Sequence, residues 1–270
     1  MEDLFSSPAM AAGYAQSRPP VHPQILNRIR ATLQITTPLP TALDIGCGAG
    51  LSSKPLTALA QHTYGIDPFH AMLRQATLTA PEAHFITSAA EALPFRQQSI
   101  HLITAAGSLN YTNLNAFFPE ATRVLLPDGA LVVYDFSQGR RFTNSPKLED
   151  WFETFRARYP APPNSGRPLS VTILASIATS FKLSAHEEFD TPIPLTISAY
   201  VKYIMTETNI AHAIRNGVSA DEIRAWLNET LAPVFEERTQ QVLFPGYIAY
   251  LSRADARAAD GHKAAPKSCR

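Results

Sequence analysis

The sequence is short of cysteine, and its charges cancel. Its two cysteines are Cys47 and Cys269, which excludes the disulfide framework of a small secreted domain. The 23 lysines and arginines equal the 23 aspartates and glutamates. The chain therefore lacks the net positive charge typical of proteins that bind nucleic acids, and we expect no nucleic-acid partner.

Long apolar runs are missing as well, although 45% of the 270 residues are hydrophobic. No run approaches the ~20 residues that cross a bilayer, and MEDLFSSPAM lacks the basic-then-apolar pattern of a signal peptide. We therefore expect a cytoplasmic protein with no membrane partner. The histidines are scattered without metal-ligand spacing, so we predict no metal site. The oligomeric state is left open.

Glycine is scarce too, yet three of the 12 glycines stand at alternate positions in LDIGCGAG (43–50). They are Gly46, Gly48 and Gly50, directly behind a short apolar run. Glycine lets the backbone take left-handed turns or approach a ligand closely. The spacing differs from the dinucleotide fingerprint G-x-G-x-x-G, and no Lys-Ser/Thr pair follows as in a P-loop. The loop is either a ligand cradle or only a tight strand–helix turn. Asp44 would hold an ammonium group or orient the loop.

Short β-rich runs alternate with helix-like segments between 41 and 136. The runs are 41–45, 62–66, 83–87, 100–106 and 130–136, the last entered through a turn at PDG (127–129). This alternation predicts a parallel sheet covered on both faces. Two further strands are predicted at 181–189 and 242–253, and Pro245 with Gly246 indicates a bulge or an edge in the second.

Four segments, in order, resemble the motifs of the class I S-adenosylmethionine-dependent methyltransferases, and of type 11-like small-molecule members in particular. They are LDIGCGAG, YGIDPFHAML, SAAEALPF and FFPEATRVLLPDGALVVYDF. YAQSRPPVHPQIL resembles the segment that precedes the fold in many such members. The resemblance implies a Rossmann-like, doubly wound α/β fold. Its seven-stranded sheet would be mostly parallel, with an antiparallel last strand and a helical cap.

The resemblance also implies a division of the chain. Residues 1–40 would cover the cofactor site, and 41–136 would form the core that binds S-adenosylmethionine. Residues 137–180 would be a helical insertion. The last two strands would lie in 181–253, with a helical lid inserted at about 190–235, and 254–270 would be a disordered tail.

Further cofactor-binding residues follow from the same resemblance. Asp67 would hold the ribose hydroxyls, or cap the helix that begins at Pro68. Ala89 stands where relatives often have an aspartate for the adenine amino group. Adenine recognition would therefore rest on the backbone of Ala89 and Ala90, with help from Glu91. Cys47 belongs to the loop, and we expect it to be mainly a small buried side chain.

The acceptor side is expected at the end of the fourth strand. Asn110 and Tyr111 are the candidate catalytic residues, positioning a small, mostly hydrophobic acceptor for in-line methyl transfer. Tyr14, Tyr200 and Tyr203 are candidate substrate-binding residues, although the helical spacing of the last two is more typical of a face packed on the core. The target atom (O, N or C) stays open. The alternative is a non-catalytic binding or assembly module on the same fold.

Overall fold

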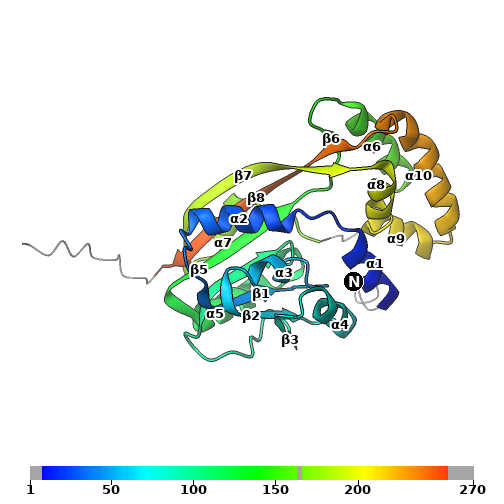
Figure 1. Cartoon of the computed structure of the whole chain (residues 1–270). Helices are drawn as coiled ribbons and strands as arrows, with labels where there is room; N and C mark the ends of the chain where they lie inside the picture. Colours follow the sequence, from blue (N-terminus) through cyan, green and yellow to red (C-terminus); the bar gives the residue numbers. More distant parts are fainter. Residues whose placement is uncertain (1–7, 163–165, 255–270) are drawn as a thin grey trace, which may run out of the picture.

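The computed structural model describes residues 8–162 and 166–254. Its eight-stranded sheet has the order β3-β2-β1-β4-β5-β8-β6, and β7 pairs with β8 (Figure 1). The strands are β1 (Leu39–Ile45), β2 (Ala60–Asp67), β3 (His84–Thr87), β4 (Ile100–Ala106), β5 (Leu125–Phe136), β6 (Arg141–Phe142), β7 (Phe181–Leu195) and β8 (Gln240–Arg253).

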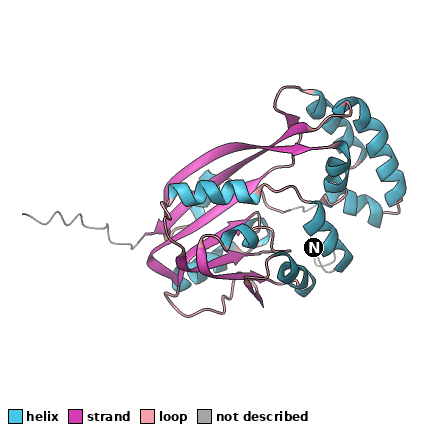
Figure 2. Ribbon diagram, viewed as in Figure 1, coloured by secondary structure: helices cyan, strands magenta, loops and turns pink. Residues whose placement is uncertain are grey.

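The helices form around this sheet (Figure 2). Those of the first half are α1 (Pro8–Ser17), α2 (His22–Thr32), α3 (Ser53–Leu56), α4 (His70–Thr79), the 3-10 turn η1 (Leu109–Tyr111) and α5 (Leu114–Val124). Those of the second half are α6 (Lys147–Arg158), α7 (Val171–Ile177), α8 (Ile197–Ile204), α9 (Thr208–Arg215) and α10 (Ala220–Phe235).

Strands β3, β2, β1, β4 and β5 are parallel. Asp44 of β1 pairs with Thr104 of β4, and Asp67 of β2 pairs with Thr87 of β3. The carboxyl ends of these strands therefore meet at one edge of the sheet, where ligands bind in open α/β folds.

The last strands run antiparallel, and β8 lies between β5 and β7. This confirms the predicted Rossmann-like α/β fold, a mostly parallel sheet with an antiparallel last strand. The two-residue β6 is an additional, eighth strand. It pairs with β8 at Val242 and Leu243.

The two sheet faces carry separate cores. Ala42, Leu102 and Val132 point to one face, under α2, α3, α6, α8, α9 and α10. Leu131 and Val133 point to the other, under α5 and α7. Neighbouring residues of β5 therefore serve opposite cores, which explains why the strand is apolar almost throughout.

The cap consists of α6, α8, α9 and α10, gathered at one end of the long β7–β8 pair (Figure 1). Helix α10 packs on α6 and α8, and α1 contacts both α4 and α8. Of the predicted tail, all but Ala254 lies outside the described residues.

Three local expectations were wrong. PDG is not a turn before the fifth strand. It belongs to β5, in a bulge where Ile100 pairs with Leu125 but Leu102 pairs with Ala130. Strand β8 is neither at an edge nor bulged at Gly246, which pairs with both neighbouring strands. Glycine is needed there because a Cβ would stand 2.3 Å from the carbonyl oxygen of Asp135. The third concerns GLSSKPLTALAQ (50–61), a stretch that indicated a helix: the structure forms one over Ser53–Leu56 only.

Candidate functional site

The glycine loop closes β1 with three left-handed residues: φ is +62° at Gly46, +53° at Gly48 and +82° at Gly50. L-residues avoid this region, so the sequence needs glycine at each position. A Cβ at Gly46 would clash with Ser108 at 2.4 Å, and one at Gly50 would press on Ala76 at 3.0 Å. A Cβ at Gly48 would meet only the flexible end of Met72, at 3.3 Å. Gly48 is therefore where a ligand could approach the backbone.

Asp44 orients this loop from below. It is fully buried, and its Oδ2 accepts hydrogen bonds from Ser52 Oγ at 2.6 Å and Ser53 Oγ at 2.7 Å. Its Oδ1 accepts one from Thr104 Oγ1 at 3.1 Å. Burial raises the pKa of Asp44 to about 6, although the hydrogen bonds from the three hydroxyls act to lower it. Of the two predicted roles, orienting the loop is the one that this position supports, since an ammonium group would not reach a buried carboxylate.

Asp67 ties the end of β2 to the glycine loop. Its Oδ2 accepts from Gly48 N at 3.0 Å and its Oδ1 from Phe69 N at 2.8 Å. Burial raises the pKa of Asp67, and the two backbone hydrogen bonds oppose the rise. A carboxylate has about four acceptor positions. One therefore remains on each oxygen for the hydroxyl groups of a ribose. Pro68 fixes the backbone between the two contacts.

Cys47 turns inward, as predicted for a small buried side chain. Its backbone N–H donates to Ile66 O at 2.9 Å, and burial raises the pKa of its thiol well above the ordinary value. The thiol is therefore an apolar filler behind the loop, and Cys47 would meet a ligand through its backbone only.

The third motif lies beside β3. Ala89 is exposed and Ala90 half-buried, which leaves their backbone available to a planar ligand. Glu91 is engaged elsewhere, because its Oε1 accepts from Asn113 N at 2.7 Å at the start of α5. Its carboxylate therefore anchors that helix, and help with adenine recognition from Glu91 stays a prediction.

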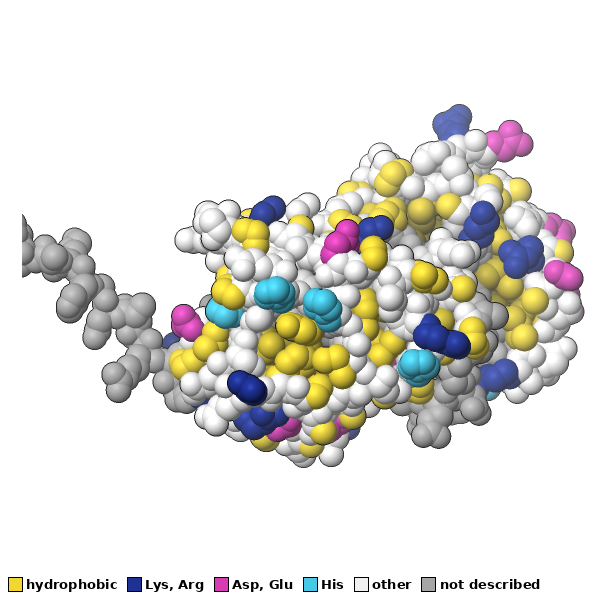
Figure 3. All heavy atoms as spheres, turned by 60° about the horizontal axis from the view of Figure 1, so that its bottom comes forward, with side chains coloured by type: hydrophobic (Ala, Val, Ile, Leu, Met, Phe, Trp, Pro, Cys, Tyr) yellow, Lys and Arg dark blue, Asp and Glu magenta, His cyan; other side chains and the backbone are white. Residues whose placement is uncertain are grey.

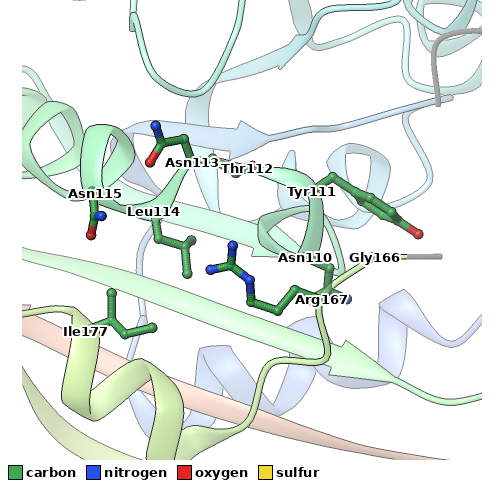
Figure 4. Close-up of a pocket in the computed structure, with 9 residues that line it drawn as sticks. All are labelled: Asn110, Tyr111, Thr112, Asn113, Leu114, Asn115, Gly166, Arg167 and Ile177. Carbon is green, nitrogen blue, oxygen red and sulfur yellow. The ribbon is translucent and has the colours of Figure 1, made fainter. Parts of the chain in front are cut away.

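A pocket of about 650 Å³ opens beside η1 and α5 (Figure 4). The candidate catalytic residues Asn110 and Tyr111 are among the residues that line it. Leu114 and Ile177 supply apolar surface, but the remaining lining is largely polar, whereas the acceptor that we expected is mostly hydrophobic. The lining residues are Asn110, Tyr111, Thr112, Asn113, Leu114, Asn115, Gly166, Arg167 and Ile177.

The three tyrosines expected to bind substrate lie elsewhere. Tyr200 is fully buried, and its hydroxyl donates to Gly139 O at 2.7 Å. Tyr203 is buried too, and the guanidinium of Arg18 lies 5.4 Å from its ring centre. Tyr14 of α1 flanks the same guanidinium at 4.5 Å. Tyr200 and Tyr203 therefore pack within the cap, while Tyr14 lies at the junction of α1 and the cap.

Sequence reasoning missed two residues at the strand ends. Ser108 donates from Oγ to Ile45 O at 2.6 Å and so joins the end of β4 to the glycine loop. Asp135, next to last in β5, accepts from Asn110 Nδ2 at 2.8 Å. An acidic residue at the carboxyl end of a parallel strand was the available signal for Asp135.

A membrane-spanning helix and a metal-binding cluster are both absent from the part of the chain that the structure describes. No helix there is long and apolar enough to cross a membrane. Within the same residues, no group of three or more His, Cys, Asp or Glu side chains could hold a metal ion.

Known proteins share this arrangement. Residues 43–133 match a family model described as a methyltransferase domain. A Dictyostelium discoideum protein named as a methyltransferase is 23% identical over 92% of this chain and 94% of its own length. A demethylmenaquinone methyltransferase of Tropheryma whipplei is 36% identical, but the match spans only 37% of this chain and 43% of that protein. A solved structure from Anaeromyxobacter dehalogenans, described as a type II methyltransferase, superposes with a TM-score of 0.65. It is 22% identical, and the match covers 87% of this chain and 97% of that one.

The motifs, the sheet order and these matches define a class I S-adenosylmethionine-dependent methyltransferase. Residues 43–133 carry the methyltransferase domain, and S-adenosylmethionine is its cofactor. The residues present fit this molecule. Gly48 leaves room for close approach at the loop, and Asp67 keeps acceptor positions for the ribose.

Proposed function

We propose that the protein transfers the methyl group of S-adenosylmethionine to a small acceptor of the phenol or quinol type. The observation that carries the proposal is the 3.0 Å hydrogen bond from Gly48 N to Asp67 Oδ2. It joins the loop and the acidic strand end into one cradle. The acceptor pocket begins at Asn110, beyond the neighbouring strand β4.

The acceptor class rests on the pocket and on the relatives. About 650 Å³ is within the range of small-molecule sites. Leu114 and Ile177 suit a ring, while the asparagine and threonine side chains suit its hydroxyl groups. Relatives matched through the cofactor-binding half are named for quinone biosynthesis, both as C- and as O-methyltransferases.

A polymeric acidic acceptor is disfavoured by the surface charge. The formal net charge is zero. On the face shown in Figure 3, lysine and arginine side chains are scattered rather than gathered into one band. A nucleic acid would require a continuous positive surface.

The chain's own residues would mainly bind and align the two reactants. Bound S-adenosylmethionine supplies an electrophilic methyl group. Asp67 would fix the ribose, and Gly48 would admit the cofactor to the loop. Asn110 and Tyr111 would hold the acceptor beside the end of β4. Alignment of this kind provides much of the acceleration in a bimolecular transfer.

The test has two steps. Calorimetry should first show binding of S-adenosylhomocysteine, the demethylated product. Incubation with labelled S-adenosylmethionine and a panel of 1,4-dihydroxynaphthalene, catechol and monophenols should then give methylated products by mass spectrometry. Binding without turnover of any phenol or quinol would contradict the proposed acceptor class and favour a non-catalytic module. Absence of binding would refute the cofactor site.

A further inference from the structure

Asp135 and Asn110 form a hydrogen-bonded pair at the ends of adjacent strands. Asn110 Nδ2 donates to Asp135 Oδ2 at 2.8 Å, and Phe136 N donates to Asp135 Oδ1 at 2.8 Å. A carboxylate offers about four acceptor positions, so one remains on each oxygen. Asp135 is only partly buried.

Gly107 leaves one side of this carboxylate uncovered. It has φ of +63°, and a Cβ there would stand 3.0 Å from Asp135 Oδ1. The next residue, Ser108, is bonded to Ile45 O beside the glycine loop. Asp135 is thus two strands from that loop, or roughly 10 Å at ~4.8 Å per strand. The end of β4 separates the cofactor cradle from this carboxylate.

The groups around Asp135 make its carboxylate a better base than one in water. Burial raises its pKa, while the hydrogen bonds from Asn110 and Phe136 oppose the rise. The titratable groups that sense its charge are Tyr111 of η1, Tyr134 of β5 itself and Tyr247 of β8. All three are phenols, which carry no positive charge that would lower the basicity of the carboxylate.

Tyr111 is the other side chain that could receive a proton, and it is the weaker candidate. Burial raises the pKa of its phenol above the ordinary value of 10.0, so its basic, ionised form is scarce near neutral pH. A carboxylate is ionised under the same conditions and can accept a proton directly.

We propose that Asp135 accepts the proton of the acceptor's hydroxyl group and that Asn110 positions it. This role rests on the proposed function. The acceptor's oxygen forms a bond to the methyl carbon, and the sulfur keeps the electron pair of the broken S–C bond. The hydroxyl O–H bond breaks, and its proton goes to Asp135. Asn110 is a positioning residue: its N–H favours the ionised carboxylate and fixes its direction.

The first test needs no turnover. The side-chain amide of Asn110 donates to Asp135, so its 15N and 1H resonances should report the titration of the carboxyl group. We expect an inflection above pH 3.8, the ordinary value, which disappears in Asp135→Asn. Resonances that stay flat, or that titrate at or below pH 3.8, would overturn the proposal.

The second test measures turnover of 1,4-dihydroxynaphthalene or catechol. Asp135→Asn should lower kcat roughly 100-fold or more, the usual contribution of a general base, with unchanged affinity for S-adenosylhomocysteine. Asp135→Glu should restore part of the rate. Asn110→Ala should move the acid limb of kcat/KM to higher pH. The matched control is Asp128→Asn, an exposed carboxylate near the opposite end of the same strand, and it should keep the wild-type rate.

The outcomes separate this role from the proposed function. Wild-type protein that binds S-adenosylhomocysteine but methylates neither probe contradicts both. Wild-type turnover that survives in Asp135→Asn contradicts the role of Asp135 alone. Loss of S-adenosylhomocysteine binding in Asp135→Asn would make the residue structural and also overturn its role as proton acceptor.

Discussion

Arg18 and Glu207 form an ion pair, Nη1 to Oε1 at 3.0 Å, that joins the segment after α1 to the cap. Their side chains retain only 20% and 6% of their exposure. Gln138, just beyond β5, also donates to the Glu207 carboxylate. One buried acid therefore holds the N-terminal segment, the cap and the end of the sheet together.

Removing one partner of this pair should be costly. Glu207→Gln leaves Arg18 without its counter-ion, and we expect a loss of roughly 3 kcal/mol in the free energy of unfolding, the low end for a buried pair. Urea denaturation measures it. The control is Arg141→Met in the exposed pair with Asp190, whose side chains are 42% and 46% exposed. That change should cost less than about 1 kcal/mol. Equal losses would show that the buried pair has no special role.

Gly48→Val should abolish binding of S-adenosylhomocysteine, because a branched side chain would fill the approach to the loop. Gly217→Val is the matched control. Gly217 also has positive φ, at +92°, and a Cβ there meets nothing within 4 Å. Both variants should lose stability through backbone strain. Calorimetry should show that only Gly48→Val loses binding. Unimpaired binding by this variant would show that the cofactor binds elsewhere.

Asp67→Asn tests the ribose contact. Hydrogen bonds to a charged group contribute about 1.5–3 kcal/mol, so affinity for S-adenosylhomocysteine should fall roughly 10- to 150-fold. The variant will also lose stability, because a side-chain amide would face a backbone N–H of Gly48 or Phe69. Calorimetry below the unfolding transition separates the two effects. An unchanged Kd with lower stability would show that Asp67 only links the end of β2 to the glycine loop.

Thr104→Val should destabilise the protein through Asp44. The lost hydroxyl donates to a buried carboxylate, so we expect a cost of roughly 1.5–3 kcal/mol. Thr63→Val provides the comparison. Thr63 is equally buried, and among the described residues its hydroxyl has no hydrogen-bond partner. Its replacement should be neutral or stabilising in thermal unfolding, and a larger loss than in Thr104→Val would contradict this account.

His22 should make stability depend on pH. Burial, followed by the charge of Arg18, lowers the pKa of His22 to about 4 from 6.5. Its Nδ1 lies 3.0 Å from the hydroxyl of Tyr134. Between these pH values the unfolded chain binds the proton and the folded chain does not, so folded stability falls as pH drops from 6.5 to 4. The stability difference between wild type and His22→Gln should shrink over this window, by no more than about 3 kcal/mol. Urea titrations at several pH values measure the free energy of unfolding of both proteins. A difference between them that stays constant from pH 6.5 to pH 4 would contradict this prediction.

The sequence predicted what depends on neighbouring residues. An apolar run followed by Gly46, Gly48 and Gly50 indicated a strand and a tight loop, and the structure has both there. The hydroxyls that hold Asp44 come partly from Ser52 and Ser53, close by in the chain. Such contacts join residues that are close in the sequence, so a sequence pattern can indicate them.

Other features depend on which strands become neighbours. Asn110 and Asp135 meet because β4 and β5 are adjacent, and no local pattern links them. The spacing of Tyr200 and Tyr203 indicated one helix face. It did not indicate that this face would turn toward the cap interior, since both a pocket wall and a core require the same apolar surface.

The position of β8 affects the order in which the molecule can assemble. This strand lies between β5 and β7, yet it follows every other described helix and strand along the chain. On the ribosome, the parallel strands up to Phe136 can pair while later residues are still being added. The long β7 has no partner in the sheet until residues 240–253 emerge, so the nascent chain would hold a folded nucleotide-binding half beside an exposed, unpaired edge.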